Sequence, residues 1–123
     1  MTTEADRHFL SHAIALGARG LGNVWPNPAV GCVIVNAGRI VGRGWTQPGG
    51  RPHAEAMALA QAGDATRGAT AYTSLEPCAH RSTRGPACTE SLIAAGVARV
   101  VSAVAGPDKR TNGAGFSELR ANG

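Results

Sequence analysis

The sequence predicts one α/β domain, in which helices cover a sheet made of a hairpin followed by parallel strands. Short apolar runs alternate with helical segments of about eight to ten residues, which is typical of crossovers between parallel strands. The chain has 123 residues, of which 43% are hydrophobic and 16% charged, and this suits a single core. We therefore expect one domain over residues 1–123.

The composition argues against several other classes of protein. Three cysteines do not suit a secreted disulfide framework, and no apolar run is long enough for a signal peptide or a membrane span. A thiol-reducing, cytoplasmic compartment is expected. The net charge of +4 is spread along the chain, and basic residues do not cluster with aromatic ones. We therefore expect no binding to nucleic acid or to a membrane.

The first expected element is an amphipathic helix that follows Thr3. Thr3 and Asp6 have the spacing of a capping box, with Asp in place of Glu. Apolar residues recur at helical spacing from Phe9 to Leu16. The helix is expected to end near Gly17 to Gly20.

A hairpin is expected next. Val30 to Val35 is typical of a buried strand, Asn36 to Gly38 supplies a turn, and Arg39 to Trp45 returns as a second strand. Before it, Trp25 to Pro28 forms a rigid loop, because its two prolines fix φ and remove amide donors. Within this loop Asn27 either caps the backbone or presents its amide to a ligand, and the residues alone leave both open.

The second half of the chain predicts helices that alternate with strands. Gly63 and Gly96 mark two helix ends. The expected elements are a helix from about Pro52 or His53 to Ala62, a strand from Thr70 to Ser74, a helix from Cys88 to about Ala95, a strand from Arg99 to Ala105 and a short helix from Phe116 to Ala121.

Three side chains that could bind a metal are not expected to do so. His8 and His12 lie one turn apart on the first helix, but no carboxylate or cysteine accompanies them. We expect them to be exposed or capping side chains. Cys32 lies inside a strand, where a small buried hydrophobe is expected.

The chemistry of the chain is concentrated between His53 and Cys88. His53-Ala54-Glu55 is followed by Pro77-Cys78 and then by Cys88. One imidazole and two thiolates suit Zn²⁺ and leave a fourth position open for water, which indicates a catalytic rather than a structural site. The pattern is typical of zinc deaminases, in which the Glu is a general acid/base and not a ligand. The separation of Cys78 from Cys88 is longer than in the common signature.

The starts of two expected helices would bring the proposed zinc ligands and Glu55 together. Residues two apart face different ways in mid-helix, but side chains of the first turn tilt toward the N-terminus, so His53 and Glu55 can reach one small volume. Cys88 opens a helix, where the dipole favours its thiolate. The alternative is a surface His and Glu on a plain helix, and the two downstream cysteines argue against it.

Five motifs together are characteristic of one family. They are Pro26 to Val35, Gly44-Trp45, His53-Ala54-Glu55, Leu75 to His80 and Ala94 to Val97. With them, nearly the whole chain closely resembles the deaminase domain of the bifunctional riboflavin-biosynthesis deaminase/reductase, within the cytidine-deaminase-like superfamily. The N-P-x-V-G-C motif and the long cysteine spacing are specific within that superfamily.

The resemblance implies a three-layer α/β/α sandwich with a cytidine-deaminase-like mixed sheet. The reaction it implies is hydrolytic removal of the 2-amino group of 2,5-diamino-6-(5-phosphoribosylamino)pyrimidin-4(3H)-one, with release of ammonia. It assigns zinc to the His and the two Cys described above, and proton transfer to Glu55. Asn27, His80 and Arg84 fall at positions that contact the substrate.

The chain departs from the family pattern near the substrate. The loop between the two zinc cysteines is longer by one residue, Gly106 and Asp108 replace a usual Asp and Asn, and Thr46 stands where many members have His. Two alternatives therefore stay open: a zinc deaminase of another aminated ring, of cytosine or guanine type, and a non-catalytic zinc-stabilised module. The intact Glu55 argues against the second.

Family members continue past a segment like Leu119 to Gly123 into a fifth strand and a reductase domain. Here we expect the reductase domain to be absent and the fifth strand to be missing. Any reduction would then come from a separate chain or a removed domain. A fourth strand left at a sheet edge is a pairing liability, which predicts a homo-oligomer.

Overall fold

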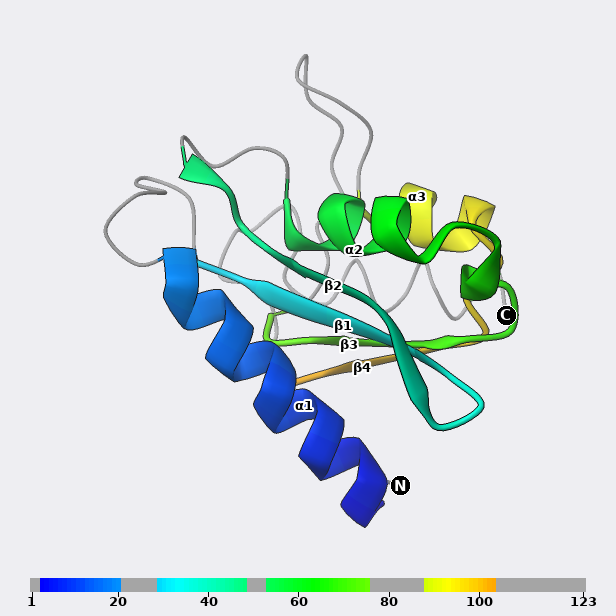
Figure 1. Ribbon diagram of the computed structural model, residues 1–123, viewed down its shortest axis with the longest axis horizontal. Coiled ribbons are helices and arrows are strands. Elements are labelled where there is room, and N and C mark those ends of the chain that lie inside the picture. Colours follow the sequence, from blue (N-terminus) through cyan, green and yellow to red (C-terminus); the bar gives the residue numbers. More distant parts are fainter. Residues whose placement is uncertain (1–2, 21–28, 49–52, 76–87, 104–123) are drawn as a thin grey trace.

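The computed structural model describes residues 3–20, 29–48, 53–75 and 88–103, apart from the side chains of residues 20, 88 and 89 (Figure 1). In chain order the elements are α1 (Glu4–Gly17), the 3-10 helix η1 (Ala18–Gly20), β1 (Gly31–Asn36), β2 (Arg39–Trp45), α2 (Ala54–Ala62), the 3-10 helix η3 (Gly63–Thr66), β3 (Thr70–Thr73), α3 (Cys88–Ala94) and β4 (Arg99–Ser102). No helix within these ranges has the length and apolar character needed to cross a membrane.

The described strands form one mixed sheet in the order β2-β1-β3-β4. β1 pairs antiparallel with both β2 and β3, whereas β3 and β4 are parallel and are connected through α3. Helix α1 lies against one face of the sheet, and α2 and α3 lie against the other (Figure 1). The predicted three-layer α/β/α sandwich, with a hairpin followed by parallel strands, is confirmed.

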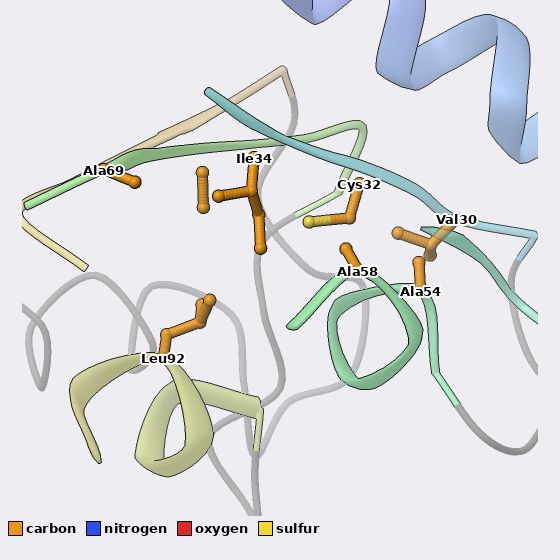
Figure 2. Packing of buried hydrophobic residues seen from close by; sticks show 8 residues of the cluster. Val30, Cys32, Ile34, Ala54, Ala58, Ala69 and Leu92 are labelled. Atoms are coloured by element: carbon orange, nitrogen blue, oxygen red, sulfur yellow. The ribbon is translucent and has the colours of Figure 1, made fainter. Parts of the chain in front are cut away.

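Strand β1 is central, and its alternating side chains supply both cores. Cys32 and Ile34 point to the face covered by α2 and α3, where Leu92 belongs to the same cluster (Figure 2). Val33 and Val35 point to the opposite face, which α1 covers. Because successive strand residues face opposite sides and both sides are buried here, this strand is a continuous apolar run.

The turn between β1 and β2 has two residues. Asn36 pairs with Arg39, which leaves Ala37 and Gly38 with φ of 52° and 79°. Positive φ at both central positions characterises the type I′ turn, whose twist matches that of the flanking strands. Glycine adopts this backbone without strain, but the Cβ of Ala37 makes it unfavourable by roughly 1 kcal/mol.

The predicted capping box of α1 is present. The Thr3 hydroxyl accepts the Asp6 N–H, and the Thr3 N–H donates to the Asp6 carboxylate, both at 3.1 Å. The same buried carboxylate accepts the Tyr72 hydroxyl at 2.7 Å and two N–H groups of Arg99 at 2.9 and 2.6 Å. One carboxylate therefore ties α1 to β3 and β4.

These contacts shift the titration of the groups involved. The Arg99 guanidinium, and then the Tyr72 hydroxyl, hold the pKa of Asp6 well below its usual range. Burial, and then the hydrogen bond to Asp6, raise the pKa of Tyr72 to about 12. Both shifts favour the charged Asp6 and the neutral Tyr72 in the folded protein.

Several element ends differ slightly from the prediction. The third helix ends at Ala94, and Gly96 follows with φ of 82°, as expected for a left-handed stop. The fourth strand ends at Ser102, earlier than predicted, because Ser102 pairs with Thr73, where β3 ends. The expected final helix from Phe116 to Ala121 and the question of a fifth strand lie outside the described residues.

Candidate active site

Helix α2 begins where the sequence predicts and carries His53 and Glu55 at its start. His53 is the N-cap residue, with extended backbone (φ −70°, ψ 162°), and its carbonyl accepts the Met57 N–H at 3.2 Å. Its imidazole makes no capping hydrogen bond. His53 is half-buried and Glu55 is buried, with 3% of its surface exposed. The first helical turn therefore carries both residues of the H-x-E motif, the imidazole at the N-cap and a buried carboxylate two residues later.

A close backbone approach between β2 and α2 sets the position of this first turn. A Cβ added at Gly44 would lie 2.2 Å from the Ala54 carbonyl oxygen, and one at Gly42 would lie 2.3 Å from the Ala58 carbonyl oxygen. The absence of side chains at Gly42 and Gly44 therefore lets the helix backbone rest directly on the strand. Ala54 separates His53 from Glu55, so this contact fixes how both residues sit against the sheet.

The topology brings the relevant element ends to one end of the sheet. Cys32 pairs with Gly44 of β2 and with Thr73 of β3, so the start of β1 lies beside the ends of both neighbours. Helix α2 starts at this end, because Ala54 lies on Gly44. Helix α3 also starts here, because it connects the end of β3 to the start of the parallel strand β4. The carboxyl ends of parallel strands are the usual ligand-binding end of α/β sheets.

Of the three predicted metal ligands, His53 alone has a described side chain. Cys78 lies outside the described residues, and Cys88 is described only as the residue at which α3 begins. Within the described part of the chain, no three His, Cys, Asp or Glu residues form a group that could hold a metal. The donor set of one imidazole and two thiols nevertheless fits zinc chemically.

The remaining candidates are the predicted substrate-contacting residues and the two histidines of α1. Asn27, His80 and Arg84, predicted to contact the substrate, lie outside the described residues. His8 and His12 belong to no metal-binding group in the described part, and they lie on α1, which covers the opposite face from α2 (Figure 1). The His8 ring contacts Phe9 edge-on, with 5.2 Å between the ring centroids.

Cys32 lies on the α2 side of the sheet. It is fully buried, as predicted, beside Ala54 and Ala58 (Figure 2). Burial, and then the negative charge of Glu55, raise the pKa of the Cys32 thiol. The thiol is therefore kept protonated, which is unfavourable for a metal ligand.

A cavity of about 370 Å³ lies elsewhere, between α1, β2 and α2. The Arg19 guanidinium carbon lies over the Trp45 ring beside it, 4.9 Å from the ring centroid. Among the described residues of the candidate site, neither His53 nor Glu55 lines the cavity. The lining residues are Leu16, Arg19, Arg43, Trp45, Met57 and Gln61.

Comparison with known proteins identifies the family. The cytidine and deoxycytidylate deaminase zinc-binding region matches residues 3–104. The chain therefore belongs to the cytidine and deoxycytidylate deaminase family. This agrees with the H-x-E pattern at the start of α2.

Two curated relatives indicate which members of the family this chain resembles in sequence. The riboflavin biosynthesis protein RibD of Escherichia coli is 48% identical over 118 residues, covering 96% of this chain and 32% of that protein. The diaminohydroxyphosphoribosylamino-pyrimidine deaminase of Buchnera aphidicola subsp. Schizaphis graminum is 41% identical over 118 residues, covering 96% of this chain and 80% of that protein. The predicted resemblance to the riboflavin-biosynthesis deaminases is thus confirmed. The chain spans about a third of the length of RibD.

Solved structures agree with this assignment. Acinetobacter baumannii RibD superposes with a TM-score of 0.92 at 44% identity, over 97% of this chain and 33% of that chain. The Aspergillus oryzae Rib2 deaminase superposes with a TM-score of 0.79 at 21% identity, over 98% of this chain and 81% of that chain. At that identity the second likeness concerns the fold alone.

Proposed function

We propose that this chain catalyses the hydrolytic deamination of 2,5-diamino-6-(5-phosphoribosylamino)pyrimidin-4(3H)-one, a step of riboflavin biosynthesis. The observation that carries the proposal is a buried carboxylate, Glu55, in the first turn of α2, beside His53 at the N-cap. A purely structural zinc site has no use for such a carboxylate. The family and the names of the relatives support the proposal.

On this proposal His53, Cys78 and Cys88 hold one Zn²⁺. When bound, such an ion acidifies a water molecule and so supplies a nucleophile at neutral pH. His53 suits the role, because it stands at the start of α2, two residues before the buried Glu55. The two thiolates reduce the net charge of the site, so a separate base is needed for the water proton.

Glu55 moves protons during the reaction. Its carboxylate takes a proton from the attacking water and delivers it to the ring nitrogen beside the carbon that bears the amine. It then transfers the second water proton to the departing amine, so that ammonia leaves and a carbonyl remains. Glu55 stands in the first turn of α2, next but one to His53, so the proposed proton carrier and the proposed zinc ligand share one helix start.

Substrate recognition is assigned to Asn27, His80 and Arg84, of which Arg84 suits the phosphate. A second candidate function, deamination of a cytosine-type or guanine-type ring, is favoured by one observation. Thr46, where many family members have His, is buried and uses its hydroxyl to accept a backbone N–H. This position therefore departs from the family pattern, which weakens the assignment of the phosphorylated pyrimidine as substrate.

The test is ammonia release by the zinc-loaded chain, offered the phosphorylated diaminopyrimidine or, separately, cytidine, deoxycytidylate or guanine. We expect release from the phosphorylated diaminopyrimidine. Release from another substrate alone would replace the first function by the second. Release from none of them would contradict both functions and favour a non-catalytic zinc module.

The role of Glu55 is tested by Glu55→Gln. We expect the variant to keep about one zinc per chain and to lose roughly two to four orders of magnitude in rate. The matched control is Glu4→Gln, which removes the same charge from an exposed position on α1 and should keep full activity. Loss of zinc together with activity in Glu55→Gln would mean that Glu55 is a ligand.

The formation of a homo-oligomer stays a prediction from the sequence. Sedimentation of the purified chain measures it directly, and a monomer at micromolar concentration would contradict it.

A further inference from the structure

Two hydroxyl groups hold the start of β1 from both sides. Thr46, which follows β2, accepts the Val30 N–H on its Oγ1 at 2.9 Å, and its own N–H donates to the Val30 carbonyl at 2.9 Å. Ser74, which follows β3, accepts the Gly31 N–H on its Oγ at 3.0 Å, and its N–H donates to the Gly31 carbonyl at 3.0 Å. We call these four residues the hydroxyl clasp.

The clasp stands where regular strand pairing ends. β2 ends at Trp45 and β3 at Thr73, so Thr46 and Ser74 are each the next residue in the chain. Val30 is buried and Thr46 has 2% of its surface exposed, so water cannot readily replace the hydroxyl as partner of the Val30 N–H. A buried N–H without a partner is strongly unfavourable, and each hydroxyl therefore holds a backbone position.

Val30 connects the clasp to the candidate active site. Its side chain lies beside Ala54 in the cluster between the sheet and α2 (Figure 2). Ala54 separates His53 from Glu55, and its carbonyl rests on Gly44 of β2. The first turn of α2 is therefore placed by Val30 and by the end of β2, and Thr46 joins these two.

We propose that Thr46 and Ser74 are positioning residues, whose hydroxyl groups fix the start of β1 and, through Val30, the first turn of α2 with His53 and Glu55. The proposal rests on the function proposed above, because it takes His53 and Glu55 as the groups that carry the chemistry. It goes further in giving Thr46 a role of its own. Its hydroxyl acts on the backbone at the start of β1.

The test compares two buried threonines at opposite ends of the sheet. Thr46→Val keeps the shape of the side chain and removes the hydroxyl, whereas Thr46→Ser keeps the hydroxyl. The matched control is Thr66→Val. Thr66 has 3% of its surface exposed, and its hydroxyl is within 2.9 Å of the Gly63 and Ala95 carbonyls. It precedes β3, and β3 begins at the end of the sheet away from the clasp.

The first readout needs neither metal nor substrate. It is amide hydrogen exchange at Met57, whose N–H donates to the His53 carbonyl and so reports on the first turn of α2. We expect exchange at Met57 to be on the order of tenfold faster in Thr46→Val than in Thr66→Val, because the first loosens this turn locally. In Thr46→Ser the exchange at Met57 should be as slow as in the unsubstituted chain. In Ser74→Ala it should be faster, as in Thr46→Val.

The second readout is the steady-state rate of the zinc-loaded chain. A displaced Glu55 transfers protons less well, so kcat should fall roughly tenfold in Thr46→Val while KM stays within about twofold. Thr46→Ser should return kcat to near the original value. Thr66→Val should keep its kcat even if its melting temperature falls by as much as that of Thr46→Val.

The outcomes distinguish the positioning role of Thr46 and Ser74 from the proposed deaminase function. Equal exchange at Met57 in Thr46→Val and Thr66→Val would overturn the positioning role, whatever the activities are. Faster exchange in Thr46→Val, in a chain whose unsubstituted form deaminates none of the substrates, would support the positioning of this turn and overturn the proposed function. If Thr46→Val does not fold, Ser74→Ala is judged by the same comparison.

Discussion

Replacing Asp6 by Ala should destabilise the fold by roughly 2–5 kcal/mol. The lost hydrogen bond from the buried Tyr72 hydroxyl to a charged acceptor contributes about 1.5–3 kcal/mol. Loss of half of the capping box at Thr3 adds about 0.5–1 kcal/mol. Arg99 contributes only about 0–1 kcal/mol, because its side chain is 47% exposed and can turn to water.

The assay is reversible denaturation of the chain by urea and by heat. For a domain of this size the loss corresponds to a melting temperature lower by on the order of 10 °C. The matched control is Glu4→Gln, which removes an acidic charge from the same helical turn at an exposed position and should cost less than about 0.5 kcal/mol. A loss in Asp6→Ala no larger than in Glu4→Gln would refute the reasoning.

The same carboxylate predicts a pH dependence with a definite sign. The folded-state pKa of Asp6 is lowered, so its contribution is fully present above the pKa of the unfolded chain, about 3.9, and is lost as the pH falls through the folded-state pKa. The difference in unfolding free energy between the unsubstituted chain and Asp6→Asn should therefore be constant from about pH 7 to pH 5 and shrink below about pH 4. A difference that grows on acidification would contradict the assignment.

Two further predictions concern backbone geometry. Gly44→Ala places a methyl group against the Ala54 carbonyl oxygen, so we expect a stability loss of about 1–3 kcal/mol together with a lower deamination rate. The control is Gly38→Ala, at positive φ but in open space, which should lose about 1 kcal/mol of stability and keep its deamination rate. Equal deamination rates in Gly44→Ala and Gly38→Ala would contradict a positioning role for Gly44. Ala37→Asn should raise the unfolding free energy by about 0.5–1 kcal/mol in urea, because Asn-Gly suits positive φ at both turn positions, and no gain would contradict the turn assignment.

Local sequence determined the elements and placed the His53-Ala54-Glu55 motif at the start of α2. The capping box at Thr3, the turn at Asn36 to Gly38 and the His53-Ala54-Glu55 motif at a helix start each depend on residues that are close in the chain. Helix caps, turns and hydrophobic periodicity act over such short distances, so the sequence predicts them directly. The apolar run from Val30 to Val35 likewise predicts a strand buried on both faces.

The clasp shows where prediction from sequence stopped. From the sequence, Thr46 is only a departure from the family pattern, and Ser74 is only the end of an expected strand. The one available signal was a hydroxyl residue directly after each of two strands. It does not tell which backbone group each hydroxyl meets, because that depends on β1 lying between β2 and β3.

Tertiary structure alone decided the contacts between distant residues. Asp6 and Arg99 are 93 positions apart and form an ion pair, and Thr46 reaches Val30 because strand pairing brings them together. The contact of Gly44 with Ala54 depends in the same way on how α2 lies on the sheet. A buried polar group must pair with whichever partner the assembled sheet brings within about 3 Å, and local propensity carries no information about that partner. The sequence therefore predicts which residues carry the chemistry, and the tertiary structure decides which residues hold them in place.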